Sequence, residues 1–244
     1  MNNPRVPAWL DTDGLAACRL LFLLSVIFSG AIAPLAHADI QFEDVTENSG
    51  ISRVGPSWSA AWGDFNADAL PDLWTSNHGA SPALYLNLGN GKFLESTPRS
   101  ATDIIADTHG AAWADFDNDG DQDLIELVGG TGANHLFINT QLDNEQRTFV
   151  ESANLVGLDY PPGRGRTPLW LDWNKDGLTD ILMTNGDRAG APTALFEQTA
   201  TGFHNATGFA GLNAEKDSDF AVLHSLSGNG NLNLIIHGGP FPQR

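Results

Sequence analysis

The sequence predicts an all-β protein, and within that class a β-propeller, from three observations. Glycine and tryptophan are abundant in this 244-residue chain, with 26 and 7 residues, which is typical of many short strands joined by tight turns. An acidic motif begins at Asp64 and recurs at Asp115 and Asp172, and intervals of 51 and 57 residues match the length of a propeller blade. After residue 38, no segment has the hydrophobic periodicity of a helix.

The first 38 residues are predicted to be a secretory signal peptide. Arg19 precedes an apolar segment, residues 20–33, and residues 36–38 (Ala-His-Ala) form a small-x-small cleavage site. The apolar segment is short and interrupted by serine and glycine, which disfavours a membrane span, and an uncleaved N-terminal anchor is the alternative. Cleavage would leave residues 39–244 as a propeller domain, secreted or periplasmic and not membrane-attached. It would also remove Cys18, the only cysteine, so we expect no disulfide in the mature chain.

Each repeat unit is predicted to be a small antiparallel sheet of four strands. The acidic motif is followed by a second recurring element, Leu-Tyr-Leu-Asn at 84–87 and Leu-Phe-Ile-Asn at 136–139, shortened to Leu-Phe at 195–196. A third element begins at Phe42, Phe93, Phe149 and Phe203. Short apolar or alternating segments between Gly/Asn/Asp turns are typical of strands. We therefore expect about three full blades and part of a fourth.

A tryptophan stands two residues before each acidic motif, at positions 62, 113 and 170. By the two-residue period of a strand, the three side chains lie on the same face of equivalent strands. We expect them to pack between neighbouring blades. A platform that stacks against sugars is the alternative.

The acidic motif is predicted to be a calcium-binding loop of nine residues. Oxygen-bearing side chains stand at positions 1, 3, 5 and 9, and so many carboxylates repel one another unless a cation lies between them. Calcium accepts six to eight oxygen ligands and tolerates irregular geometry, whereas magnesium demands a near-octahedron. Position 7 adds a backbone carbonyl, and glycine at position 6 permits the tight reversal. The predicted ligands are Asp64, Asn66, Asp68, Leu70 and Asp72 in loop 1; Asp115, Asp117, Asp119, Asp121 and Asp123 in loop 2; and Asp172, Asn174, Asp176, Leu178 and Asp180 in loop 3.

The copies of the loop are not equivalent. Ala69 replaces glycine at position 6 of loop 1, so we expect weaker binding there. A fourth copy offers only the oxygens of Ser225, Ser227, Asn229 and Asn233 and is expected to bind nothing. The alternative for all copies is a plain Asp/Asn/Gly turn that binds no ion. Three copies of the motif in the same register disfavour this alternative. Glu126 gives loop 2 an EF-hand pattern, but we interpret this as chance because loops 1 and 3 have threonine and methionine at that position.

These loops at blade spacing resemble the FG-GAP or VCBS repeat. The Phe-x-Asp-Val-Thr opening near residue 42 and the later Leu-Tyr-x-Asn and Gly-x-Phe segments are similar to bacterial relatives of cartilage acidic protein. The resemblance covers residues 39–239 and implies an exported calcium-binding propeller that serves in adhesion. Such propellers usually have about seven blades, so the resemblance leaves two alternatives. The chain is a piece of a longer propeller, or it closes tightly, with residues 42–46 as a latch for the last blade. We favour the first, because an open blade exposes a strand edge.

Composition and motifs limit the function further. With 12 basic and 30 acidic residues the net charge is −18, which disfavours a nucleic-acid partner. We expect a module that binds another protein or a carbohydrate, with calcium in a structural role. One alternative is a propeller-fold enzyme, a polysaccharide hydrolase or lyase; another is a truncated fragment with no independent function. The polar residues available for catalysis are His78, His109, His135, Glu126, Arg164 and Arg166, and we interpret them as turn or packing residues.

Overall fold

The computed structural model describes residues 41–53, 55–142, 146–186, 191–212, 217–226 and 232–238. The chain divides into two compact units, Met1–Asp44 and Val45–Arg244, and every strand belongs to the second. The predicted signal peptide lies outside the described residues. Within the described ranges, no helix is both long enough and apolar enough to cross a membrane.

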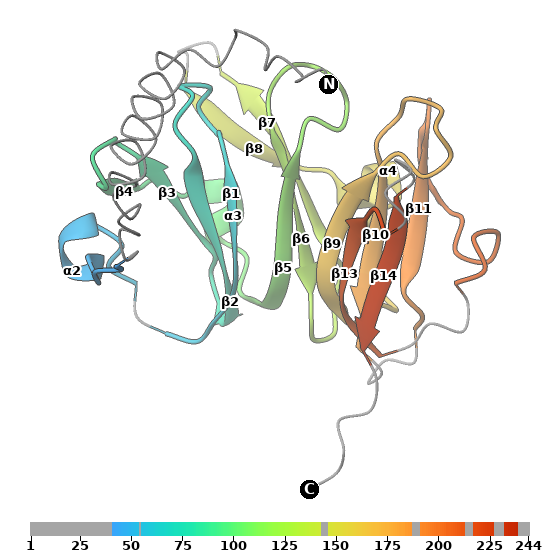
Figure 1. Cartoon of the computed structure of the whole chain (residues 1–244). Coiled ribbons are helices and arrows are strands. Elements are labelled where there is room, and N and C mark those ends of the chain that lie inside the picture. Colours follow the sequence, from blue (N-terminus) through green and yellow to red (C-terminus); the bar gives the residue numbers. More distant parts are fainter. Residues whose placement is uncertain are drawn as a thin grey trace, which may run out of the picture. The chain divides into compact units, whose positions relative to one another are not determined.

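The strands follow one another as four-stranded antiparallel blades, as predicted (Figure 1). Blade 1 contains β1 (Ser57–Gly63), β2 (Asp72–Ala80), β3 (Ala83–Asn87) and β4 (Phe93–Glu95). Blade 2 contains β5 (Ala106–Ala114), β6 (Asp123–Val128), β7 (His135–Gln141) and β8 (Arg147–Glu151). Blade 3 contains β9 (Gly165–Leu171), β10 (Asp180–Asn185), β11 (Ala194–Thr199) and β12 (Gly202–Asn205). The fold is thus an all-β propeller of the predicted type.

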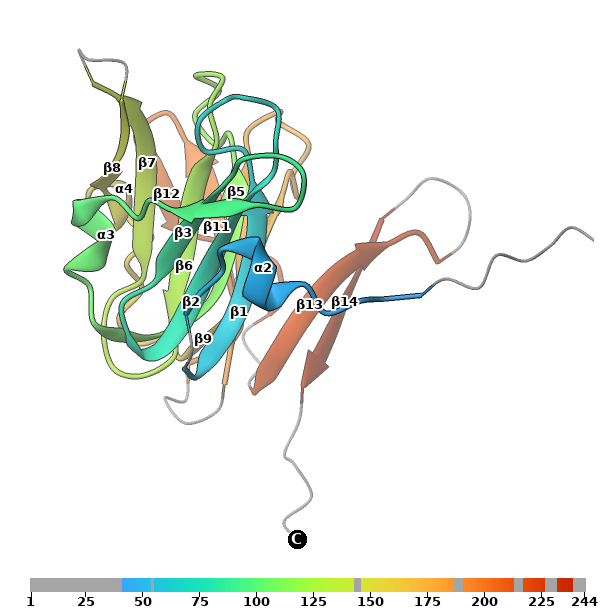
Figure 2. The same ribbon diagram turned by 90° about the vertical axis from the view of Figure 1, so that its left-hand side faces the viewer.

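A partial fourth blade consists of β13 (Ser218–His224) and β14 (Asn233–Gly238), which pair with each other as a hairpin (Figure 2). Three one-turn helices, which the sequence did not predict, are α2 (Thr46–Ser49), α3 (Arg99–Thr102) and α4 (Ala153–Val156). The segment 42–46, considered as a latch for the last blade, forms no strand, and Thr46 begins α2.

The first strand of each blade contacts the first strand of the next, so that β1, β5, β9 and β13 lie in sequence along the interior of the fold. Strand β2 also pairs briefly with β5, at His78–Asp107 and Ala80–Ala106, which joins blades 1 and 2 into one eight-stranded sheet. Each acidic loop connects the first strand of its blade to the second. All three loops therefore lie at one end of these inner strands, and the β2–β5 bridge lies at the other.

The hydrophobic core lies between the blades. Neighbouring residues of β6 enter different clusters: Leu124 packs between blades 1 and 2, and Ile125 between blades 2 and 3. In β10, Ile181 and Leu182 divide in the same way between the clusters on either side of blade 3. Successive side chains of a strand point to opposite faces, so an uninterrupted apolar segment marks a strand that is buried on both sides.

The motif tryptophans pack between blades, which confirms the prediction for two of them. Trp113 donates its indole N–H to the carbonyl of Ala61 in blade 1 at 3.3 Å. A Cβ on Gly63 would stand 2.4 Å from the Trp113 ring, so only glycine admits this contact. Trp170 donates in the same way to Ala112 at 3.4 Å. Trp62, in blade 1, has no preceding blade among the described residues and is 57% exposed.

Candidate functional site

The three acidic loops, residues 64–72, 115–123 and 172–180, share one backbone conformation. Their fourth and sixth residues are left-handed, with φ between +59° and +97°. The sixth residue is glycine in loops 2 and 3, but in loop 1 it is Ala69 with φ +66°. A side chain with a Cβ is strained in this region. Loop 1 therefore adopts the same turn as the others at a conformational cost.

In loops 1 and 3, backbone amides hold the first and last aspartates. Asp64 accepts hydrogen bonds from the amides of Asp68 and Ala69, at 3.1 and 2.9 Å. Asp72, at position 9, accepts one from the amide of Phe65 at 2.9 Å. Loop 3 repeats the pattern, since Asp172 accepts from two amides of its own loop and Asp180 from the amide of Trp173. These bonds turn both carboxylates toward the interior of the loop.

Loop 2 differs because several of its buried carboxylate oxygens have no hydrogen-bond partner among the described residues. These atoms are Oδ1 of Asp115, Oδ2 of Asp123 and Oδ1 of Asp121. The side chains of Asp115, Asp117 and Asp119 each offer an oxygen, and the three oxygens lie within 4.8 Å of one another. Buried oxygens without donors, grouped around one loop, suit a hard divalent cation. The residues of loop 2 therefore fit calcium.

One member of loop 2 has a separate role for its side chain. Arg147 of β8 donates to Oδ2 of Asp121 at 2.5 Å. The predicted ligand from Asp121 is its backbone carbonyl, and this ion pair leaves the carbonyl available. The amide of Asp121 meanwhile donates to Asp119 at 3.1 Å, as the amides of Leu70 and Leu178 do to the aspartates at position 5 of their loops.

The electrostatics of loop 2 also favour a cation. Burial raises the pKa of Asp123 to about 7, and the neighbouring aspartates add to this rise. Burial and other aspartates of the loop also raise the pKa of Asp117. In the other two loops, burial raises the pKa of Asp72 and of Asp180. With a pKa of about 7, the Asp123 carboxyl is partly protonated near neutral pH. A bound divalent cation would reverse that effect by stabilising the charged form.

The fourth copy of the loop is only partly within the described residues. Asn233 accepts a hydrogen bond from the amide of Leu226 at 3.3 Å, while Ser227 and Asn229 lie outside the described residues. Nothing in the described part of this segment adds a carboxylate.

Glu126 does not belong to loop 2, in agreement with the interpretation of its EF-hand match as chance. It lies within β6, is fully buried, and accepts hydrogen bonds from the Trp74 indole at 3.0 Å and the Ser76 hydroxyl at 2.6 Å. Burial raises its pKa to about 7. Glu126 is therefore a packing residue, which agrees with the interpretation of the polar candidates as turn or packing residues. The sequence signal for its burial is a single charged residue inside the apolar segment 124–128.

Two of the remaining polar candidates, His109 and Arg166, belong to a row of side chains that was not predicted from the sequence. Trp58, His109, Arg166 and Asp219 are 51, 57 and 53 residues apart, so they occupy equivalent positions on β1, β5, β9 and β13. The Trp58 and His109 rings stack with centroids 4.0 Å apart. Arg166 Nη1 lies 2.7 Å from His109 Nδ1, and Arg166 Nε lies 3.7 Å from Asp219 Oδ1. The repeat itself therefore brings these four side chains together.

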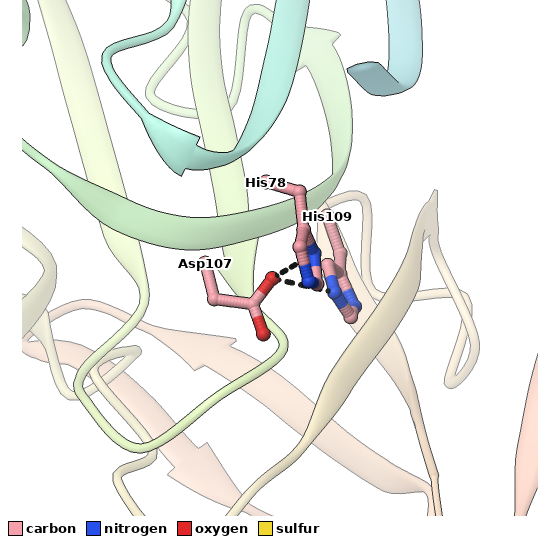
Figure 3. A group of neighbouring side chains, drawn as sticks. All are labelled: His78, Asp107 and His109. Atoms are coloured by element: carbon pink, nitrogen blue, oxygen red, sulfur yellow. Dashed lines mark ion pairs between the residues drawn. The ribbon is translucent and has the colours of Figure 1, made fainter. Parts of the chain in front are cut away.

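Histidines 78 and 109 lie within strand ends rather than in turns, which corrects the sequence interpretation. His78 of β2 pairs with Asp107 of β5 in the short bridge between these strands. Both histidines contact the Asp107 carboxylate (Figure 3). The other candidates are separate from this group: His135 lies at the start of β7, 4.0 Å from Glu151. Arg164 precedes β9, and its charge helps to lower the pKa of His109.

Comparisons with known proteins agree with the repeat. An FG-GAP-like repeat matches residues 64–126, from the first acidic loop to Glu126. The chain is 27% identical to cartilage acidic protein 1 of Xenopus tropicalis over 172 residues, which are 65% of this chain and 25% of that protein. It is 27% identical to the mouse protein of that name over 157 residues, which are 59% of this chain and 23% of that protein. It is 25% identical to the human protein over 182 residues, which are 69% of this chain and 26% of that protein. The chain thus spans about a quarter of the length of these relatives.

Proposed function

We propose that this FG-GAP repeat protein is an exported, calcium-stabilised propeller module that binds another macromolecule, a protein or a carbohydrate, in adhesion. The observation that carries the calcium assignment is the set of buried, unpartnered oxygens on Asp115 and Asp123 in loop 2. The similarity to cartilage acidic protein 1 supports an adhesion-type module. Export rests on the apolar leader and the cleavage site at residues 36–38.

The acidic loops stand where calcium would stabilise the contacts between blades. The Asn139 side chain of blade 2 donates to the carbonyl of Phe65 in loop 1 at 2.8 Å. The Gln198 side chain of blade 3 donates to the carbonyl of Phe116 in loop 2 at 3.1 Å. Asn139 and Gln198 stand at equivalent positions of the third strand, two residues after the phenylalanine of the Leu-Phe segment. Blades 2 and 3 therefore each hold the acidic loop of the blade before them. A cation that fixes a loop would therefore also fix its neighbour.

The partner is proposed as a class. The net charge of −18 disfavours nucleic acid, and calcium bound at the loops would leave the rest of the acidic surface exposed. We do not extend the proposal to catalysis, because neither the repeat family nor the similar proteins are named for an enzymatic activity. Hydrolysis of a polysaccharide panel that is lost in His109→Ala would reverse this choice.

Calorimetry on the full chain tests the calcium assignment. Calcium should bind with at least one site in loop 2, and Asp119→Ala should remove that site. Asp103→Asn, which neutralises an exposed acidic residue after α3, should leave the stoichiometry unchanged. Equal binding by the wild type and by Asp119→Ala would show that loop 2 holds no calcium.

A further inference from the structure

A second group of possible metal ligands lies at the end of the inner strands opposite the acidic loops. It consists of His78, at the end of β2, and of Asp107 and His109, near the start of β5. Oδ1 of Asp107 points between the two imidazoles, in contact with Nδ1 of His78 and 3.0 Å from Nε2 of His109 (Figure 3). One ligand atom from each residue lies within 4.8 Å of the other two.

Two of these atoms are buried and make no hydrogen bond within the described residues. They are Nε2 of His109 and Oδ1 of Asp107, which lie 3.0 Å apart as an ion pair. The His109 side chain is fully buried, whereas that of Asp107 is 28% exposed. A buried polar atom without a partner costs free energy. Both atoms could coordinate one cation together, which would replace their direct contact at 3.0 Å.

The surroundings hold the His109 ring in a fixed position. A Cβ on Gly129, the residue after β6, would stand about 2 Å from three atoms of the ring, so this close approach requires glycine. The Trp58 ring stacks on the imidazole. The carbonyl of Gly165 lies 2.8 Å from His109 Nδ1 and can accept its proton, which leaves the lone pair of Nε2 directed at Asp107. A backbone carbonyl on the second nitrogen is common for histidines that bind metals.

Arg166 favours the opposite tautomer. Its Nη1 lies 2.7 Å from His109 Nδ1, and a guanidinium only donates, so this contact requires Nδ1 to accept and places the proton on Nε2. Arg166 has other acceptors within reach, the carbonyl of Gly165 at 3.3 Å and Asp219 at 3.7 Å. Burial meanwhile lowers the pKa of His109, which keeps the ring neutral in either tautomer. A metal bound at Nε2 would select the tautomer that donates to Gly165.

We propose that His78, Asp107 and His109 form a site for a transition-metal ion of the zinc class, distinct from the acidic loops. Two imidazole nitrogens and a carboxylate are a ligand set that zinc prefers, whereas calcium prefers oxygens alone. Three protein ligands leave one coordination position open in a tetrahedral site. His78 is 51% exposed, so the ion and a fourth ligand can enter from solvent on its side.

Zinc titration of the calcium-saturated full chain, purified without a histidine tag, tests the proposal. Calorimetry should show one zinc per chain in the wild type. His78→Ala and Asp107→Asn should each weaken that binding by about tenfold or more. The matched control is His204→Ala, which removes an exposed histidine that also lies beside a carboxylate, 3.6 Å from Glu197, and it should bind zinc like the wild type.

Fluorescence adds a readout at the site itself. Because Trp58 stacks on His109, zinc should change tryptophan emission in the wild type, and Trp58→Phe should lose most of this change while calorimetry still detects the ion. His78 is largely exposed, so its alanine variant should fold, and a circular dichroism melt checks this. The proposal is overturned if His78→Ala and His204→Ala bind zinc equally, or if folded wild type binds none.

Discussion

At the residue scale, the sixth position of loop 1 carries a measurable strain. Ala69 has φ +66°, where loops 2 and 3 have glycine. A left-handed conformation costs a residue with a Cβ about 1–2 kcal/mol. Glycine avoids this cost, but its greater conformational freedom in the unfolded chain offsets part of the gain in stability. Ala69→Gly should therefore stabilise the chain by roughly 1 kcal/mol in EDTA and tighten calcium binding at loop 1.

Urea denaturation and calorimetry measure these two effects, with Ala67→Gly as the matched control. Ala67 is also left-handed, with φ +59°, but the fourth position is not glycine in the other loops. This control should change stability without tightening calcium binding. Unchanged stability and affinity in Ala69→Gly would mean that the turn does not need glycine.

Glu126 predicts a pH dependence at the same scale. Burial raises its pKa to about 7 in the folded protein, from an ordinary value of 4.5. The folded state thus binds the proton more tightly, so the stabilisation is fully present below pH 4.5 and is lost as the pH rises through 7. In saturating calcium, Glu126→Gln should lose less stability than the wild type between pH 5 and 8. Urea denaturation at several pH values measures this, and Glu95→Gln, on the exposed β4, is the control; equal slopes in all three proteins would contradict the raised pKa.

At the element scale, the third strand of each blade determines how the preceding loop is held. Asn139 donates to the carbonyls of Phe65 and Gln122, at 2.8 and 3.1 Å. Asn139→Ala should cost about 1–3 kcal/mol, because it leaves buried acceptors without a donor. The Asn87 side chain, at the equivalent position of blade 1, donates to Pro71 and accepts from the amide of Gly89, both within its own blade. Asn87→Ala is therefore the matched control and should cost less in urea denaturation; equal losses would mean that the contact between blades contributes little.

Strand order and blade number could be predicted because they follow from local patterns. The acidic loops, the Leu-Phe segments and the phenylalanine segments each mark a turn or a strand directly. The row formed by Trp58, His109, Arg166 and Asp219 could not be predicted in this way, because four different residue types hide the equivalence of their positions. Their equivalence is visible only from their spacing to the acidic motif, since each stands six residues before one of its copies. The partners of Glu126 could not be predicted for a related reason: Trp74 and Ser76 come from another blade.

At the scale of the whole molecule, charge repulsion and its relief by calcium dominate the expected behaviour. The three loops contain 3, 5 and 3 acidic residues, or eleven of the 30. Three calcium ions would change the net charge from −18 to −12, since each adds two positive charges. The largest relief falls on loop 2, where five aspartates lie together and buried oxygens have no partner among the described residues.

We expect chelation of calcium to lower the melting temperature substantially. Extracellular modules bind calcium with dissociation constants of roughly 10⁻⁴–10⁻³ M. At about 1 mM calcium, a site with a dissociation constant of about 10⁻⁴ M contributes about 1.4 kcal/mol, and three such sites contribute about 4 kcal/mol. For a domain of this size, that corresponds to a shift of roughly 10 °C. A thermal melt in EDTA against 2 mM calcium measures the shift, and 2 mM magnesium should reproduce little of it, because magnesium requires an octahedral site. Asp119→Ala should lose about a third of the calcium response. An identical melt in EDTA and in calcium would show that hydrogen bonds alone order the loops, since the amides that already hold Asp64 and Asp172 would then suffice without an ion.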